Sequence, residues 1–393
     1  MAQRYRSNID SNSSRREFLT LLGLAGVGLC LQGCNACNGP KVSGGKELRF
    51  YGTGTLDIEE AGWERLKRDL GITLKFEDNG NDTGPVITKM IAGNAATEYD
   101  LGGLQGGAER ELAEAGKILP WDLEKIPNWK SVWEWASAIP YTKWQGKQYG
   151  LPVVINADSM IYLPDLVGEI DTYAAVFDPK LKGKTAMEDA WINSVIFTAI
   201  FLKENALQKI IDPGDLTEDE LGGVMEFLIK KKKEGQFRTF WNGWEQGLNL
   251  IVTREVHVMT GWEPIVLAAR KGGVNAKYAV PKEGYEGWSN DLLLHVGAKE
   301  RGLEELAHMF ANWELGGYYG CALATKRGYV VPADTSVEYA EHQPNEFDVN
   351  EQKQISQNVQ NKFQKMKGQV YWQNVRPKNY RSYEEWWSRL RTA

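Results

Sequence analysis

The stretch LRFYGTGTLDIEEAGWERLKRDLGITLKFE, residues 48–77, is the part of the sequence that points most directly to a fold class. Residues 48–51 and 72–77 read as strands, the second because apolar and polar residues alternate. Between them a helix is expected from about residue 57 to residue 70, ending at Gly71. A helix over 85–92, a strand over 99–104 and a helix over 108–115 follow. This alternation predicts βαβ units and a largely parallel sheet.

The remainder of the chain continues as an α/β protein, with long helices expected at 191–205, 217–233 and 303–315. Trp386 and Trp387 are expected to pack a C-terminal helix. There is no internal repeat and no polar linker after residue 46. Because the 360 residues after residue 33 exceed the usual size of one hydrophobic core, we expect two lobes.

Composition excludes several classes of protein. The chain has 393 residues, of which 42% are hydrophobic and 25% charged, with a mean hydropathy of -0.44. These values do not fit a polytopic membrane protein, a disordered chain or a disulfide scaffold. The net charge of -6 leaves no basic excess for binding nucleic acid. The 15 Trp, 16 Tyr and 12 Phe supply ample flat aromatic surface, some of which could face a ligand.

The N-terminus has the features of an export signal. Arg15 and Arg16 precede an apolar run over 18–31 that is too short to span a bilayer, which resembles a twin-arginine signal. The run ends in Leu-Gln-Gly-Cys34, which is similar to the cleavage and acylation signal of bacterial lipoproteins. We therefore expect a signal peptide over 1–33, a tether over 34–46, lipid attachment at Cys34 and a periplasmic, membrane-anchored protein. The alternatives are a buried first helix for 18–31 and a redox or metal site for Cys34 with Cys37.

Motifs of catalysis and of metal binding are absent from the sequence. The four histidines lack ligand spacing, and no P-loop or G-x-S-x-G motif is present. We therefore expect no cofactor, no metal and no enzyme activity. Gly102, Gly103, Gly106 and Gly107 lie between a strand and a helix. They could expose backbone N–H groups to an anion or allow tight packing of the helix on the strand, and the sequence leaves both open.

Five ordered stretches resemble one known family. They are Tyr149-Gly-Leu-Pro152, residues 177–184 followed by Glu188-Asp189, Gly261-Trp262 followed by Ala269-Arg270, residues 280–284 followed by Trp288, and Gly328-Tyr329-Val-Val-Pro332. Together they resemble the periplasmic spermidine/putrescine-binding proteins, within the family 1 extracellular solute-binding proteins of ABC importers. The resemblance covers most of residues 47–335.

The resemblance implies a periplasmic binding protein type II-like fold, in which each of two lobes is a mixed sheet flanked by helices and a hinge joins them. Lobe one would comprise 47–156 plus 289–335, and lobe two would comprise 157–288 plus 336–393. It implies a monomeric binding protein that delivers a small molecule to an ABC permease in the inner membrane.

The family's ligand residues transfer only in part to this sequence. Aromatic positions are retained, whereas the loop at 52–55 lacks the family's tryptophan and two carboxylates are lost near residue 190. Since a buried ammonium group needs ring faces and carboxylates, we expect a small, polyamine-like organic amine. The alternatives are a sugar or a small carboxylate or phosphonate in the same fold, and an exported enzyme. The expected ligand-binding residues are Trp262, Glu263, Trp288, Tyr329, Glu188, Asp189, Asp291 and Trp244.

Overall fold

The computed structural model describes residues 46–80 and 82–393, which belong to one compact unit. The expected signal peptide and most of the tether, with Arg15, Arg16 and Cys34, lie outside the described residues. No helix among the described residues combines the length and the apolar character needed to cross a membrane.

The first three strands confirm the expected βαβ arrangement. Strands β1 (Glu47–Gly52), β2 (Thr73–Asp78) and β3 (Leu101–Gln105) are parallel, with β1 between the other two. Helices α2 (Glu59–Leu70), α3 (Thr83–Ile91), α4 (Ala95–Glu98) and α5 (Glu109–Glu114) connect and follow them. Gly71, at φ 68°, ends α2 in the left-handed conformation that glycine adopts without strain.

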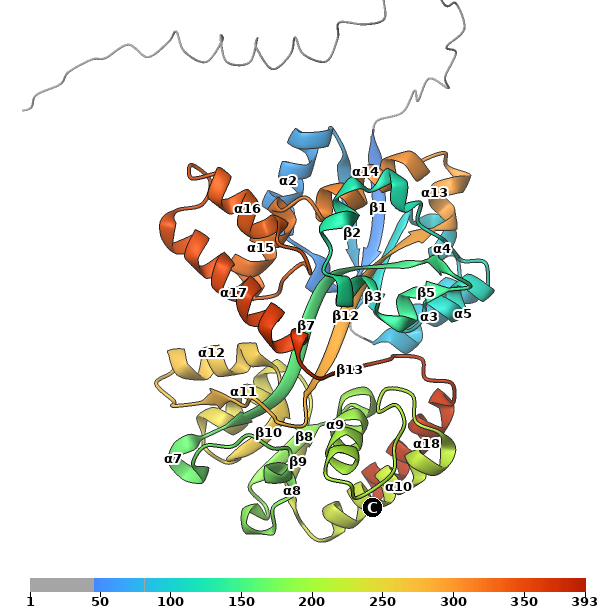
Figure 1. Cartoon of the computed structure of the whole chain (residues 1–393). Helices are drawn as coiled ribbons and strands as arrows, with labels where there is room; N and C mark the ends of the chain where they lie inside the picture. Colours follow the sequence, from blue (N-terminus) through green and yellow to red (C-terminus); the bar gives the residue numbers. More distant parts are fainter. Residues whose placement is uncertain (1–45, 81) are drawn as a thin grey trace, which may run out of the picture. The chain divides into compact units, whose positions relative to one another are not determined.

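Two long strands run through both lobes, as Figure 1 shows for the green and orange arrows at the centre. They are β7 (Gly150–Tyr162) and β12 (Tyr285–His295), every residue of which is buried. The two strands are antiparallel to each other. At one end β12 pairs with β3, and at the other end β7 pairs with β10 (Val258–Gly261). The lobes therefore share a single hydrogen-bonded sheet, in the order β2-β1-β3-β12-β7-β10-β8-β9.

The remaining strands are short and complete the sheet. Strands β8 (Thr185–Glu188) and β9 (Phe237–Trp241) extend lobe two in parallel. Strands β4 (Ile118–Leu119) and β13 (Val370–Trp372) pair with β12, and β11 (Lys277–Tyr278) pairs with β7. A separate hairpin joins β5 (Lys143–Trp144) to β6 (Lys147–Gln148).

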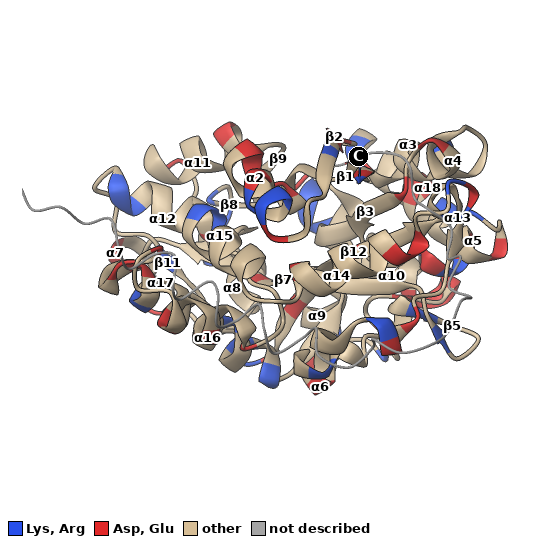
Figure 2. Ribbon diagram, turned by 90° about the horizontal axis from the view of Figure 1, so that it is seen from above, with Lys and Arg blue, Asp and Glu red and all other residues tan. Residues whose placement is uncertain are grey.

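Helices cover the sheet in both lobes (Figure 1). Lobe one also carries α6 (Glu134–Ser137), α13 (Val296–Glu300), α14 (Glu304–Glu314), α15 (Tyr318–Arg327), α16 (Thr335–His342) and α17 (Val349–Lys367). Lobe two carries α7 (Pro164–Val167), α8 (Ala174–Phe177), α9 (Trp191–Glu204), α10 (Glu218–Lys233), α11 (Trp244–Val252), α12 (Glu263–Lys271) and α18 (Tyr380–Thr392). Figure 2 shows acidic and basic positions distributed over the helices on both sides of the molecule.

The C-terminal part of the chain divides between the lobes differently from the expected assignment of 336–393 to lobe two. Ile355, Val359 and Met366 of α17 belong to the same hydrophobic core as Leu48 and Phe50 of lobe one. Tyr371 of β13 and Trp387 of α18 join the core of α9 and α10 in lobe two. The segment after α17 therefore passes from lobe one to lobe two alongside β12, as a third connection.

Candidate functional site

The site begins with a polar face on the two long strands. In the antiparallel register Asp158 lies opposite Glu286, and Asn156 lies opposite Trp288. Because side chains alternate along a strand and paired residues share a face, all four project to the same side of the sheet. Each is at most 7% exposed. Polar side chains buried at the point where the lobes join require partners, and these partners define the site.

Asp158 is the centre of this polar face. Its Oδ2 accepts a hydrogen bond from Trp288 Nε1 at 2.7 Å, and its Oδ1 accepts from Asn156 Nδ2 at 2.8 Å and from the Tyr278 hydroxyl at 3.3 Å. Burial nevertheless raises the pKa of Asp158 to about 6. The neighbouring Glu286 has no hydrogen-bond partner on either carboxyl oxygen. Burial, and then the charges of Asp158 and Glu188, raise the pKa of Glu286 well above its usual value.

Lobe two contributes Glu188, at the end of β8, and Trp262, between β10 and α12. Glu188 Oε2 accepts from Asn193 Nδ2 at 2.6 Å, and the Trp262 indole also donates to this carboxyl group. Burial, and then Asp158, raise the pKa of Glu188 to about 8. Trp262 has extended backbone (φ -89°, ψ 133°) and precedes the first residue of α12, so it lies at the turn from β10 into α12. Its ring packs edge-on against Trp241 at 5.1 Å.

Lobe one contributes Tyr329, which follows α15. Its ring meets Trp288 edge-on at a centroid distance of 5.4 Å, and burial, and then Asp158, raise the pKa of its hydroxyl. Glu188, Trp262 and Tyr329 are partly exposed. We call the seven residues of this set the junction cluster: Asn156, Asp158, Glu188, Trp262, Glu286, Trp288 and Tyr329. Four of the eight residues expected to bind ligand thus come together.

Glu263, next to Trp262, is engaged by two lysines of α17. Its Oε2 lies 2.7 Å from Lys362 Nζ and 2.8 Å from Lys365 Nζ. Burial would raise the pKa of Glu263, but the two lysines lower it to about 2. Lys362 also donates to the Asn156 side chain. Since α17 packs on lobe one and α12 belongs to lobe two, these ion pairs bridge the lobes.

A second set of side chains bridges the lobes through the third connection. Gln373, which follows β13, donates from Nε2 to Asn193 Oδ1 at 2.5 Å, and its Oε1 accepts from Gln105 of β3. Asn193 in turn holds Glu188. A continuous hydrogen-bonded chain therefore runs from Gln105 in lobe one to Glu188 in lobe two.

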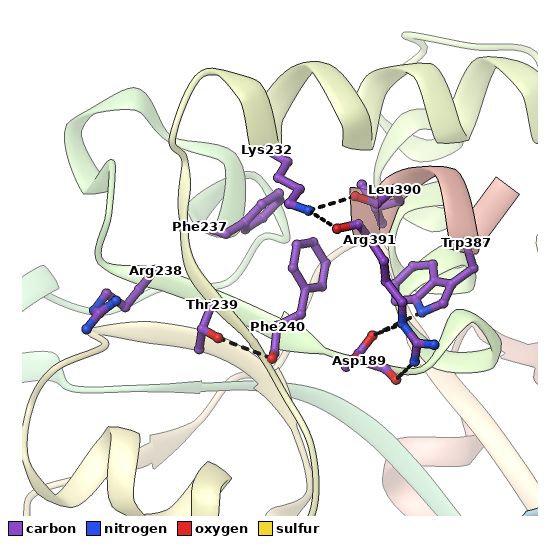
Figure 3. A pocket seen from close by; sticks show the side chains of 9 residues that line it. All are labelled: Asp189, Lys232, Phe237, Arg238, Thr239, Phe240, Trp387, Leu390 and Arg391. Carbon is purple, nitrogen blue, oxygen red and sulfur yellow. Dashed lines mark hydrogen bonds and ion pairs between the residues drawn. The ribbon is translucent and has the colours of Figure 1, made fainter. Parts of the chain in front are cut away.

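Asp189 lies away from the junction cluster, in a cavity of about 330 Å³ against α18 (Figure 3). Its carboxylate accepts from Trp387 Nε1 at 3.1 Å and from Arg391 Nε at 2.9 Å. The other charged groups of this cavity are also paired: Lys232 with carbonyl oxygens at the end of α18, and Arg238 with Glu255. The cavity is lined by Asp189, Lys232, Phe237, Arg238, Thr239, Phe240, Trp387, Leu390 and Arg391. These pairings tie α18 to lobe two, so we place the candidate site at the junction.

Asp291 and Trp244 also lie outside the junction cluster. Asp291 is fully buried in lobe one, where its charge acts on the buried Glu109. Trp244 is the first residue of α11 and is 41% exposed. The glycine segment serves packing, because a Cβ at Gly106 would meet Tyr141 at 2.2 Å and one at Gly102 would meet His295 at 2.1 Å.

Sequence reasoning missed several residues of the site. Asn156 and Asp158 stand two positions apart in β7, and Glu286 and Trp288 stand two positions apart in β12. Because residues two positions apart on a strand share a face, this spacing indicates one polar face within otherwise buried strands. That signal was available. No local signal marks Asn193, Lys362 or Gln373, because their partners are far away in the sequence. Among the described residues no group of His, Cys, Asp and Glu is placed to hold a metal ion.

Comparisons with known proteins agree with this architecture. The family model for bacterial extracellular solute-binding proteins matches residues 64–355. A protein of Listeria monocytogenes described as a spermidine/putrescine ABC transporter is 17% identical, with a TM-score of 0.66 over 88% of this chain and 99% of that one. The spermidine/putrescine substrate-binding protein of Streptococcus pneumoniae is 13% identical, with a TM-score of 0.67 over 88% and 99%.

A third structure with the same fold is the binding protein MotA of A. tumefaciens B6, solved in complex with glucopine. It is 14% identical, with a TM-score of 0.63 over 88% of this chain and 99% of that one. These structures share the two-lobe fold, and the family model covers most of the chain. The chain belongs to the bacterial extracellular solute-binding protein family.

Proposed function

We propose that this protein is the substrate-binding component of an ABC importer and that it binds a small organic amine at the junction cluster. The arrangement of Glu188 and Asp158 beside the rings of Trp262, Trp288 and Tyr329 carries the proposal. Both carboxyl groups have raised pKa values in the structure. An ammonium group placed among them would favour their ionised forms and would face aromatic rings.

Two structures of the same fold bear names that include spermidine and putrescine, and the third contains glucopine. At identities of 13–17% these names leave the ligand of this chain open. A sugar or a small anion is the alternative. Among the residues that could hold an anion, Lys362 and Lys365 are already paired with Glu263, which favours the amine.

A thermal-shift screen over amines, sugars, carboxylates and phosphonates tests this proposal. A ligand present at 100 times its Kd stabilises the folded chain by about 2.7 kcal/mol, which is a measurable shift in Tm. We expect amines to stabilise the protein and the other classes to leave it unchanged. Stabilisation by sugars or anions alone would exclude the amine.

Substitutions at the site sharpen the test. Trp262→Ala should weaken binding of the selected amine by ten- to a hundredfold, since a ring facing a desolvated cation contributes about 2 kcal/mol. Glu255→Gln is the control, because Glu255 pairs with Arg238 in lobe two, outside the junction cluster. We expect its affinity, measured by calorimetry, to equal that of the wild type.

We further propose export through a twin-arginine signal and lipid attachment at Cys34, which would anchor the protein in the cell envelope facing the periplasm. The support is the sequence of residues 15–34. Labelled palmitate should be incorporated into the wild-type chain and not into Cys34→Ala. Equal labelling of the two proteins would refute the anchor.

A further inference from the structure

The charges at the junction can be balanced group by group. Lys362 and Lys365 both contact Glu263, and both also act on Asp158. Two cations therefore face two carboxylates. Because buried charges must be paired, these four groups form a neutral set that needs no further ion.

Two carboxyl groups of the junction cluster remain, and they differ in their surroundings. Glu286 is fully buried, lies opposite Asp158 in the strand register, and receives no hydrogen bond. Such a group stays protonated, because nothing stabilises its charge. Glu188 is partly exposed and is oriented by two donors, Asn193 and Trp262. Hydrogen bonds to the carboxylate favour its ionised form once a cation is beside it.

We propose that the site takes a ligand with a single cationic group, and that Glu188 binds this group and releases one proton as it does so. The inference rests on the proposed amine-binding function and narrows its ligand class. A dication or polyamine would require a second carboxylate at the junction that no lysine balances, and the lysines already act on Asp158. Of the carboxylates expected from the sequence, Asp189 pairs with Arg391, Asp291 lies in lobe one with Glu109, and Glu263 is held by the lysines.

The release of a proton on binding follows from the groups that surround Glu188. Carboxyl groups approach it from β7 (Asp158), from β12 (Glu286) and from the next residue (Asp189), while Asn193 of α9 and Trp262 donate to it. The lysines of α17 act on Asp158 and Glu263. Burial, and then the charges of Asp158 and Asp189, thus oppose the ionisation of Glu188, and its pKa of about 8 leaves it mostly protonated at pH 7. Binding a cation reverses this balance.

The test compares probes that differ by one charge. Butylamine and 1,4-diaminobutane have the same carbon chain with one and two ammonium groups, and choline carries one charge that does not titrate. We expect the monocations to stabilise the chain more than the diamine in thermal-shift titrations. Calorimetry of the best monocation at pH 7, in phosphate and in HEPES, should show release of about one proton per ligand bound. Affinity should increase roughly tenfold per pH unit as the pH rises towards 8 and then level off.

Variants separate the possible results. Glu188→Gln should abolish the proton release and flatten the pH dependence, whereas Glu255→Gln, which removes an ion pair with Arg238 away from the junction cluster, should preserve both. Tighter binding of 1,4-diaminobutane or spermidine than of any monocation would overturn the single-charge inference and leave the amine function standing. Binding of a monocation without proton release at pH 7 would remove Glu188 from the role assigned here. If no amine stabilises the chain, the proposed function itself fails.

Discussion

Several buried carboxyl groups of this protein lack a cationic partner. Glu314 has no hydrogen bond on either oxygen, and Glu109 and Asp291 are two neighbouring buried carboxyl groups inside lobe one. Two carboxyl groups buried side by side do not both ionise, so one of them carries a proton. Burial, and then Asp291, raise the pKa of Glu109 well above its usual value, and burial raises the pKa of Asp291 to about 6. These groups bind protons more tightly in the folded state than in the unfolded state.

The pair should therefore make stability depend on pH. Its contribution is complete below the unfolded pKa of about 4 and is lost as the pH rises through the folded pKa values. For one group the loss is about 1.4 kcal/mol for every pH unit that separates its folded pKa from its unfolded pKa. Glu109→Gln keeps an acceptor for the Gly107 amide, which lies 2.8 Å from Oε2, and provides a donor for Asp291. We expect urea unfolding of this variant to show greater stability than the wild type at pH 8 and a flatter profile from pH 5 to 8.

Glu114→Gln is the control for this prediction, because Glu114 lies on the same helix α5 and is exposed. It should retain the wild-type profile. Parallel profiles for Glu109→Gln and the wild type would show that the buried pair is not the source of the pH dependence.

Among the individual residues of the junction cluster, the aromatic ones could be predicted from the sequence better than the acidic ones. Trp262, Trp288 and Tyr329 could be placed because each stands in a short motif that resembles a known family. The carboxylates depend on contacts between distant segments. Glu263 meets lysines 99 and 102 positions later in the chain, and no local pattern reveals that these lysines approach it.

Among the elements, helix α18 shows how two adjacent tryptophans take different roles. Trp387 is 3% exposed in the core of lobe two, and its Nε1 donates to Asp189. Trp386 is partly buried, and the Arg389 guanidinium lies over its ring. We predict that Trp387→Ala destabilises the fold by about 3–5 kcal/mol, the usual effect of removing a buried aromatic side chain.

Trp386→Ala is the matched comparison on the same helix and should destabilise the fold much less. Neither variant should change affinity for the ligand, since α18 lies outside the junction cluster. Chemical denaturation gives the two stabilities. Equal losses for the two variants would mean that α18 packs in another orientation.

The order and type of the elements followed from sequence periodicity, including the first βαβ units and the helices at 191–204, 218–233 and 304–314. The lobe on which α17 packs could not be predicted from sequence periodicity. An amphipathic helix such as α17 carries an apolar stripe that fits either lobe, and the choice depends on the path of the chain between them.

For the whole molecule, the relevant question is what holds the two lobes together in the absence of ligand. Strands β7 and β12 and the segment around Gln373 connect them covalently. The pairs of Glu263 with Lys362 and Lys365, and the chain through Gln373 and Asn193, connect them noncovalently. A side-chain substitution leaves the covalent connections intact, so the ion pairs between the lobes can be weakened at Glu263, which lies next to the junction cluster and is not part of it.

Proteins with two such lobes close on a ligand by hinge motion. We expect ligand to reduce the radius of gyration in solution scattering while helix content stays constant. Glu263→Gln removes the charge that attracts both lysines, so its ligand-free form should be more open. The decrease on ligand binding should then be larger and the affinity a few-fold lower, because closure becomes less favourable. Glu255→Gln removes an ion pair with Arg238 inside lobe two and should scatter like the wild type. Identical ligand-free curves for Glu263→Gln and the wild type would show that the ion pairs do not control closure.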